Sequence, residues 1–335
     1  MSPTPNPTSP LNADQHGVML DLGSLDIGDL DLTALDGVCS HWSRHAATQP
    51  AETAARIADA DLIITNKVVI GAEQMDAATR LRLICIAATG TNNVDLDAAR
   101  ERGIAVTNVT GYGTPSVVQH VFAILLGWAT RLWEQHHAVR AGDWSRSTHF
   151  CLLGEGFDLP MRELAGLRLG IVGYGELGQG VARAAEAFGM EVLLAERPGA
   201  SPRAGRVPLH ALLPRVEVLS LHCPLTDATR NLIGAPEFVL MRPDALLINT
   251  ARGGIVDEQA LADALRAGTI GAAAVDTLTS EPPPPDHPLL AADIPNLIVT
   301  PHAAWASRES RQRLVDGVAE NIRAFIAGES RNRVD

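Results

Sequence analysis

The chain has few aromatic residues and no apolar run long enough to span a bilayer. Phe, Trp and Tyr make up 4% of its 335 residues, so alanine, leucine and valine must form most of the core. The longest apolar stretch, 121–130, is much shorter than the about 20 residues that a transmembrane helix needs. Residues 1–17 lack the basic and apolar regions of a signal peptide. These absences predict a cytoplasmic protein that does not act at a membrane.

Cysteine is also scarce, and its spacing predicts neither disulfides nor a metal site. The four cysteines are far apart and form no Cys-x-x-Cys pair: Cys39, Cys85, Cys151 and Cys223. Such spacing is typical of free thiols in a reducing compartment. His136 and His137 are adjacent and would face different sides of a helix, which is poor spacing for metal ligands. We therefore expect no metal.

Basic residues are fewer than acidic residues. The chain has 27 Lys and Arg against 39 Asp and Glu, which gives a net charge of -12. This balance argues against nucleic acid as a partner, because binding to phosphates requires basic patches. It still allows an anionic substrate, since one arginine can dominate the field inside a pocket. The length and the 46% hydrophobic content favour two domains with large cores.

Short apolar segments alternate with helix-like segments along most of the chain. Strands are expected at 62–65, 81–86, 104–107, 167–172, 190–195, 216–221, 245–248, 272–275 and 297–299. Helices are expected at 53–60, 95–102, 177–188, 236–241 and 257–266. Such alternation predicts parallel βαβ units. The pattern restarts at residue 167, so we expect two doubly wound α/β domains, one Rossmann-like and one flavodoxin-like.

Two longer segments set the predicted domain boundaries. Residues 115–140 are expected to form one long buried helix. Residues 308–327 are expected to form an amphipathic helix that returns to the first domain, because no strand accompanies it. We therefore predict a disordered tail at 1–17, a substrate domain formed by 18–114 and 303–335, and a nucleotide domain inserted at 115–302.

A glycine-rich loop predicts a dinucleotide site. Residues 173–178 read Gly-Tyr-Gly-Glu-Leu-Gly, follow an expected strand and open an expected helix. In that context the first glycine makes a tight turn and the second lets backbone amides approach a pyrophosphate. The third allows close packing of helix on strand, and the helix N-terminus attracts the phosphates.

The residues near Glu196 bear on the choice of cofactor. Glu196 ends the next expected strand, where an acidic side chain binds the adenosine ribose hydroxyls and repels a 2′-phosphate. Arg197, Arg203 and Arg206 lie in the same loop and could instead hold a 2′-phosphate. We expect NAD and keep NADP as the alternative.

Arg252, Glu281 and His302 follow three expected strands, at the edge where open α/β sheets bind ligands. A guanidinium can hold a carboxylate through two hydrogen bonds and polarise an adjacent keto oxygen. An imidazole can move a proton while a hydride is transferred, and a carboxylate can fix its tautomer and favour its charged form. The other histidines considered are read as packed or surface residues: His41, His45, His136, His137, His149, His210 and His287.

The order and spacing of these motifs resemble those of the D-isomer-specific 2-hydroxyacid dehydrogenases. The likeness covers residues 18–327 and rests on the glycine loop, the Asn-Thr-Ala-Arg-Gly-Gly segment 249–254, the Glu-Pro segment and the Pro-His segment. The segments 87–95, 111–120 and 150–153 look most like glycerate dehydrogenases, also called hydroxypyruvate reductases. One departure is Glu196, because many members have aspartate there.

The resemblance implies NAD-dependent reduction of a small 2-keto acid, hydroxypyruvate or glyoxylate, to D-glycerate or glycolate, and the reverse reaction. The catalytic residues would be Arg252, Glu281 and His302. Thr89 and Gly90 would offer backbone groups to the substrate carboxylate, beside Arg252 and His302. A homodimer would form around 115–140. Expected cofactor contacts are Gly173, Tyr174, Gly175, Glu176, Leu177, Gly178, Glu196, Arg197, His222, Cys223, Pro224, Thr229, Thr250, Ala251, Arg252, Asp276 and His302, with Asp276 on the nicotinamide carboxamide.

A second functional class stays open at this point. Corepressors that resemble this family use the same scaffold as an NAD-sensing interaction module. The intact set of Arg252, Glu281 and His302 weighs against that reading, and no appended interaction domain is evident. Neither the substrate's side chain nor the direction of the reaction follows from these residues. Trp144 and Trp305 could shape the pocket or belong to the core.

Overall fold

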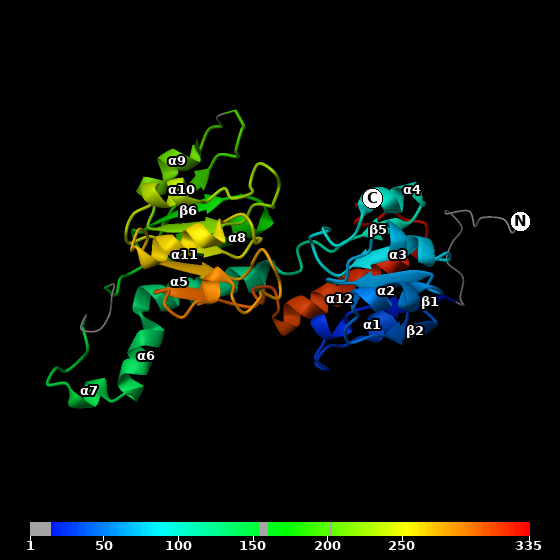
Figure 1. The fold of residues 1–335 in the computed structure, drawn as a ribbon, viewed down its shortest axis with the longest axis horizontal. Helices are drawn as coiled ribbons and strands as arrows, with labels where there is room; N and C mark the ends of the chain where they lie inside the picture. The colour runs from blue at the N-terminus through cyan, green and yellow to red at the C-terminus, as the bar shows by residue number, and fades with distance from the viewer. Residues whose placement is uncertain (1–14, 154–159, 202) are drawn as a thin grey trace, which may run out of the picture. The chain divides into compact units, whose positions relative to one another are not determined.

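The computed structural model describes residues 15–153, 160–201 and 203–335. The chain divides into two compact units (Figure 1). One consists of Met1–Gly113 and Ala306–Asp335, and the other, Thr114–Trp305, is inserted between these segments. Each contains one parallel sheet, of five strands in the first unit and seven in the second. We call them the five-stranded and the seven-stranded unit.

The five-stranded unit has the strand order of a flavodoxin-like sheet. Its strands are β1 (His16–Met19), β2 (His41–Arg44), β3 (Leu62–Thr65), β4 (Leu83–Ile86) and β5 (Ala105–Thr107). They pair in the order β2-β1-β3-β4-β5, all parallel. This is the 2-1-3-4-5 order of doubly wound proteins, so the fold class expected for the unit is confirmed.

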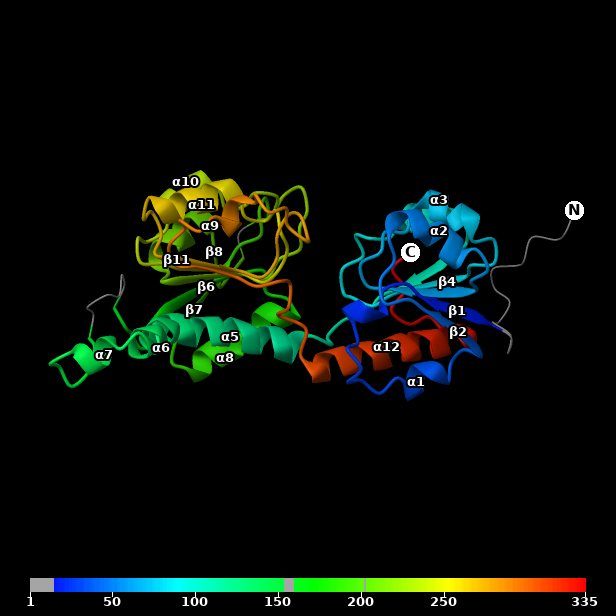
Figure 2. The same ribbon diagram turned by 60° about the horizontal axis from the view of Figure 1, so that its bottom comes forward.

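Helices cover both faces of this sheet (Figure 2). On one side lie α2 (Pro50–Ile57), α3 (Ala72–Ala77) and α4 (Leu96–Glu101), whose apolar side chains join the core of the sheet. On the other side lie α1 (Thr33–Asp36) and α12 (Arg308–Ile326), and η1 (Leu22–Ser24) follows β1. The apolar face of α12 is therefore buried although α12 brings no strand of its own.

The seven-stranded unit has the order of a dinucleotide-binding sheet. Its strands are β6 (Arg168–Val172), β7 (Glu191–Ala195), β8 (Arg206–Val207), β9 (Val218–Leu221), β10 (Leu246–Asn249), β11 (Ala272–Val275) and β12 (Leu297–Val299). They pair in parallel in the order β12-β11-β10-β9-β6-β7-β8. The strand order reverses between β6 and β9, which is where such sheets bind ligands.

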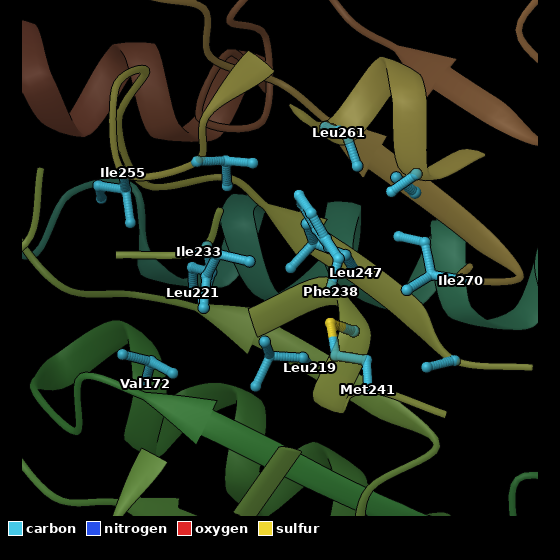
Figure 3. Packing of buried hydrophobic residues seen from close by; sticks show 14 of the residues in the cluster. Val172, Leu219, Leu221, Ile233, Phe238, Met241, Leu247, Ile255, Leu261 and Ile270 are labelled. Carbon is cyan, nitrogen blue, oxygen red and sulfur yellow. The ribbon is translucent and has the colours of Figure 1, made fainter. Parts of the chain in front are cut away.

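Two helices, α5 (Thr114–Thr130) and α8 (Glu176–Ala187), cover one face of this sheet (Figure 2). The opposite face carries α9 (Leu209–Leu212), η2 (Leu213–Arg215), α10 (Ala235–Leu240) and α11 (Glu258–Arg266), and η3 (Pro288–Leu290) packs beside α11. Figure 3 shows the core on that side, where Phe238 and Met241 lie over Leu219 and Leu247. A rigid core of this kind fixes the strand ends that carry the candidate site.

The prediction of one long buried helix at 115–140 is wrong in two respects. It ends at Thr130, and α6 (Leu132–Arg140) begins after Arg131, whose φ of 54° lies in the left-handed region. No residue of α6 is buried, whereas α5 is largely buried. Arg131 is buried and pairs with Glu134, three residues later, at 3.1 Å, so a local ion pair accompanies a backbone conformation that the sequence does not suggest.

All nine expected strands occur within two residues of their predicted bounds. The expected helix 53–60 begins three residues earlier, at Pro50, because proline suits the first turn of a helix. The strands β1, β2 and β8 were not predicted, and β1 overlaps the end of the expected tail at 1–17. Residues 1–14 of that tail lie outside the described residues. Throughout the described part of the chain, no helix is both long and apolar enough to cross a membrane.

Candidate active site

The glycine loop connects β6 to α8 at the point where the strand order reverses. Gly173 has a φ of +92°, and a Cβ there would lie 2.5–2.6 Å from backbone atoms of His222 and Cys223. A Cβ at Gly178 would lie 2.2 Å from the carbonyl oxygen of Gly173. Around Gly175, in contrast, a Cβ would meet nothing within 4 Å. Two glycines are therefore required by close packing, and the middle one faces open space, as a pyrophosphate cradle requires.

Side chains of the loop make contacts within the same unit. Thr114 at the start of α5 donates its hydroxyl to Glu176 at 2.6 Å. The guanidinium of Arg206 lies 5.0 Å from the centroid of the Tyr174 ring. These contacts attach the loop to α5 and to β8, the edge strand.

Glu196, directly after β7, is bound within its own loop. Its carboxylate accepts hydrogen bonds from the backbone N–H of Arg197 and of Arg203, both at 2.9 Å, and forms an ion pair with the Arg203 side chain. That guanidinium, aided by the backbone donors, lowers the pKa of Glu196 to about 2. The carboxylate therefore stays charged at neutral pH while Arg203 offsets its charge, which sequence reasoning did not anticipate.

Three neighbouring strand ends of the seven-stranded unit hold buried polar atoms without a hydrogen-bond partner among the described residues. They are Nδ1 of His222 after β9, Oγ1 of Thr250 after β10 and Oγ1 of Thr277 after β11. Burial lowers the pKa of His222 to about 4, so the ring is neutral, and its Nε2 lies 2.8 Å from Ser220 Oγ. Unpaired buried groups cost free energy, so their concentration at one sheet edge indicates that a ligand completes them.

The loop after β9 contains three further expected cofactor contacts. Thr229 donates its hydroxyl to the carbonyl of Pro224 at 2.7 Å and accepts from the backbone N–H of Thr226 at 2.7 Å. Burial raises the pKa of the Cys223 thiol to about 11, which leaves it uncharged and unreactive. In this structure the Thr229 hydroxyl braces the loop.

Arg252 follows β10 in a tightly braced turn. The side chain of Asn249 accepts from the N–H of Ala251 at 3.1 Å and donates to the carbonyl of Arg252 at 2.9 Å. The guanidinium itself donates to the carbonyl of Ala251 at 2.7 Å and forms no ion pair with any residue in the described ranges. A charge held on a rigid turn without a carboxylate partner is suited to bind an anionic ligand.

Glu281 and His302 come together although twenty residues separate them. Oε2 of Glu281 lies 2.7 Å from Nδ1 of His302, and both side chains are partly exposed. Oε1 of Glu281 accepts from the backbone N–H of Leu278 at 2.9 Å. His302 has a φ of 53°, a conformation that costs free energy for a side chain other than glycine and that is concentrated at functional sites. The expected carboxylate–imidazole pair is therefore formed.

Asp276 holds the turn that places His302 in that conformation. Its carboxylate accepts from the Thr300 hydroxyl at 2.5 Å and from the backbone N–H groups of Ala303 and Ala304, at 2.8 and 3.0 Å. The backbone N–H of His302 donates to the carbonyl of Asp276 at 2.8 Å. Asp276 was expected to contact the nicotinamide, and its bracing role was missed because the two segments are distant in sequence.

Thr89 and Gly90 belong to the five-stranded unit, in the loop after β4. The hydroxyl of Thr89 donates to the carbonyl of Val109 at 3.0 Å, and its carbonyl accepts from the Asn108 side chain at 2.7 Å. Thr89 is exposed, so its loop is braced while its surface stays accessible. Among the described residues no cluster of His, Cys, Asp or Glu has the geometry of a metal site.

The edge of the seven-stranded sheet fits a dinucleotide. The open space at Gly175, the amino end of α8 and the acidic residue after β7 are arranged as the pyrophosphate and the ribose require. The partnerless atoms of His222, Thr250 and Thr277 lie at the neighbouring strand ends. The unit therefore offers both a cradle and polar atoms that a bound nucleotide can satisfy.

Known proteins are similar to this chain in sequence and in structure. Residues 122–304 match the family described as D-isomer specific 2-hydroxyacid dehydrogenase, NAD binding domain. The chain is 42% identical to a glycerate dehydrogenase of Methylorubrum extorquens over 93% of this chain and 98% of that protein. It is 37% identical to a hydroxypyruvate reductase of Blautia hydrogenotrophica, over 95% and 99% of the two chains.

Among solved structures, a protein from Thermus thermophilus superposes with a TM-score of 0.83. It is 36% identical in sequence, and the superposition covers 96% of this chain and 100% of the other. The family match includes more than half of the chain, and the two relatives cover nearly all of it. The chain therefore belongs to the D-isomer specific 2-hydroxyacid dehydrogenase family.

Proposed function

We propose that this chain reduces hydroxypyruvate, and more slowly glyoxylate, to the D-2-hydroxy acid with NADH, and catalyses the reverse oxidation. The observation that carries the proposal is the 2.7 Å contact between Glu281 and His302, at the same strand ends as the unpaired guanidinium of Arg252. The relatives named glycerate dehydrogenase and hydroxypyruvate reductase support the choice of substrate.

In this proposal His302 moves the proton. Glu281 accepts from Nδ1–H, so Nε2 is the ring nitrogen that donates a proton to the developing alkoxide and takes it back in the oxidation. The contact with Glu281 fixes the tautomer and the orientation of the ring for this donation. The turn held by Asp276 fixes the ring, so little reorganisation is needed when the substrate binds.

Arg252 binds the substrate carboxylate and polarises the keto oxygen beside it. Its turn is rigid because Asn249 bonds to it on both sides. When bound, the nicotinamide supplies the hydride that reduces the keto carbon. From the family resemblance, Thr89 and Gly90 are proposed to offer backbone groups to a substrate carboxylate.

For the cofactor we propose NAD over NADP. The carboxylate of Glu196 stays ionised, with a pKa of about 2, and would repel a 2′-phosphate. Its ion pair with Arg203 weakens that repulsion, so NADPH should bind as well, with lower affinity. The pyrophosphate would lie at Gly175, with the neighbouring loop residues Tyr174, Glu176 and Leu177 beside it.

We further propose a homodimer. The helices α6 and α7 (Asp143–Arg146) extend from the end of α5 away from the sheet of their unit (Figure 1). Along this arm large apolar side chains are exposed, namely Leu132, Trp133, Val139 and Trp144. Exposed apolar side chains that gather along one segment are typical of protein interfaces, and a second copy is the partner that the family's resemblance implies. Light scattering should give twice the mass of the chain.

The activity is tested by adding hydroxypyruvate to purified protein and NADH and following the absorbance at the nicotinamide band. We expect steady oxidation of NADH, slower oxidation with glyoxylate, and a higher KM with NADPH. A panel of 2-keto acids with either cofactor that yields no turnover would end the proposal. Quenching of NADH fluorescence without turnover would instead favour the interaction module.

A further inference from the structure

We propose that Glu258 and His287 form a second carboxylate–imidazole pair whose task is to position Glu281, and through it His302. The inference rests on the proposed reductase function. His287 was expected to be an ordinary packed or surface histidine, and nothing in its sequence neighbourhood links it to Glu258, which lies 29 residues earlier.

The pair is buried and its protonation follows from its contacts. Nε2 of His287 lies 3.0 Å from Oε2 of Glu258, and the two side chains are 6% and 13% exposed. The backbone N–H of Leu289 donates to Nδ1 of His287 at 3.2 Å. Because Nδ1 accepts, Nε2 carries the proton and donates it to the carboxylate. The ring of His287 is thus held in one tautomer, with its Nε2–H donating to the Glu258 carboxylate.

The second oxygen of Glu258 holds the other end of the same loop. Oε1 accepts from the backbone N–H of Thr279 at 2.7 Å. One carboxylate on the first turn of α11 therefore closes the loop 279–287 at both ends. Glu281 lies within this loop, two residues after Thr279.

The loop end that Glu258 holds also contacts both proposed catalytic segments. The N–H of Leu278, next to Thr279, donates to Oε1 of Glu281 at 2.9 Å, while Oε2 of Glu281 meets His302. A Cβ at Gly253 would lie only 2.0 Å from the carbonyl carbon of Leu278 and 2.4 Å from the nitrogen of Thr279. The backbone there is thus packed directly on the residue after Arg252.

The energetics favour positioning over simple stabilisation. A buried carboxylate requires compensation of its desolvation, and an apolar pair of similar volume would often stabilise a fold equally well. The hydrogen bonds of Glu258 instead fix the peptide N–H of Thr279 and the ring of His287, on either side of Glu281, in one geometry. A small displacement of Thr279 would move Glu281 relative to His302. It would also remove the backbone against which Gly253 packs.

A double-mutant cycle tests whether His287 acts through Glu281. The variants are His287→Ala, Glu281→Gln and both together, with kcat and KM for hydroxypyruvate and the Kd for NADH as readouts. We expect His287→Ala to lower kcat roughly 10- to 100-fold and to leave the Kd for NADH unchanged. In the Glu281→Gln background the same change should cost no more than about twofold, because the shared effect is already lost. Equal losses in both backgrounds would overturn the proposal.

Two conservative variants separate the contacts of the ring. His287→Gln keeps a donor at the place of Nε2 and should restore most of kcat. His287→Asn keeps only the acceptor for Leu289 and should be as slow as His287→Ala. If Asn rescues and Gln does not, the turn at η3 matters and the pair with Glu258 does not. This comparison decides the matter even where His287→Ala fails to fold.

The matched control is His210→Ala. His210 pairs with Glu237 at 3.1 Å, so it too is a histidine that contacts a glutamate in the first turn of a helix. It is exposed, however, and its partner lies in α10 and not beside the loop 279–287. Its loss should leave kcat unchanged. Wild-type protein without turnover would remove the proposed function and this inference together. Wild-type turnover with an unimpaired His287→Ala variant would remove the inference alone.

Discussion

The carboxyl ends of the strands are built differently in the two units. In the seven-stranded unit, buried polar atoms of His222, Thr250 and Thr277 lack a partner in the described structure, directly after β9, β10 and β11. In the five-stranded unit such atoms belong to residues before or within strands: Gln15, Trp42 and Arg82. There the acid after β1, Asp21, accepts from the backbone N–H groups of Asn66 and Lys67 at 2.9 and 2.7 Å.

Polar groups that the protein itself satisfies have a structural role, whereas buried polar groups left without a partner indicate a ligand site. Burial raises the pKa of Asp21, and the backbone donors offset that penalty, so its loop is complete without a ligand. An unpaired buried group costs about 1–3 kcal/mol, and three at neighbouring strand ends are tolerated where a ligand supplies the missing bonds. Both sheets are parallel and doubly wound, but the polar groups at the strand ends are satisfied in the five-stranded unit and unsatisfied in the seven-stranded unit.

The largest expected effect is that of His302→Ala. Loss of the proton donor should lower kcat roughly 10²- to 10⁴-fold with hydroxypyruvate. The matched change in the five-stranded unit, His41→Ala, removes an exposed ring from β2 and should leave kcat unchanged. Steady-state kinetics of both variants measure this. A His302→Ala enzyme of near wild-type kcat would break the comparison at its central residue.

Replacement of an arginine should have opposite consequences in the two units. Arg252 makes no ion pair among the described residues, so Arg252→Ala should leave the melting temperature unchanged while raising KM and lowering kcat/KM roughly 10²- to 10³-fold. Arg80 pairs with the mostly buried Asp61 at 2.7 Å, so Arg80→Ala should cost about 1–3 kcal/mol of unfolding free energy without changing KM. Denaturant unfolding and steady-state kinetics of both variants measure these effects. A destabilised Arg252→Ala variant, or a raised KM in Arg80→Ala, would contradict the prediction.

Two glycines allow a comparison of packing with backbone conformation. Gly253→Ala places a Cβ 2.0 Å from backbone of Leu278, and we expect a loss of at least about 3 kcal/mol together with loss of activity. Gly28→Ala in the five-stranded unit meets nothing within 4 Å, so only its φ of +89° counts, at about 1 kcal/mol. Denaturant unfolding measures both. Equal losses of unfolding free energy in the two variants would show that the backbone at Leu278 shifts at little cost to admit the Cβ.

The smallest effect concerns the pair of Glu196 and Arg203, in which only the guanidinium is exposed. The pKa of Glu196 is depressed from 4.5 to about 2, so the pair stabilises the fold above pH 4.5 and loses this contribution as the pH falls toward 2. The difference in melting temperature between wild type and Arg203→Ala should vanish over that interval. Arg203→Ala should also weaken NADPH up to about fivefold and spare NADH.

The corresponding ion pair of the five-stranded unit is Arg102 with Asp76, at 2.8 Å. Arg102 likewise lowers the pKa of its carboxylate partner, so Arg102→Ala should show a similar loss of stability that disappears in acid. It should change the affinity for neither nucleotide. A change in NADPH affinity in this control would mean that surface charge, and not the loop at Glu196, sets the cofactor preference.

Central strands were predictable because they are buried on both faces and must be continuously apolar. Two of the three strands that escaped prediction lack this constraint. β2 (His41–Arg44) and β8 (Arg206–Val207) are edge strands with polar residues, and the short β1 follows a polar tail. The break at Arg131 was missed because arginine is a good helix former, and nothing in the neighbouring sequence marks the left-handed conformation.

The same distinction holds for the candidate site. Arg252, Glu281 and His302 could be placed at strand ends because each follows an apolar run, and the glycine loop carries its own signature. The hydrogen bonds from Asp276 to the His302 turn, the ion pair of Glu196 with Arg203 and the contact of Glu258 with His287 could not be predicted. Each joins segments whose separation in sequence carries no information about distance in space.

The sequence by itself determined the fold class, the dinucleotide loop and the residue types of the site. These follow from local periodicity and from chemistry that needs particular side chains at short spacings. Only the tertiary structure decided which polar groups are satisfied by the protein and which are left for a ligand. Hydrogen bonding at strand ends depends on loops that meet across the sheet, and their meeting is set by the packing of the whole unit.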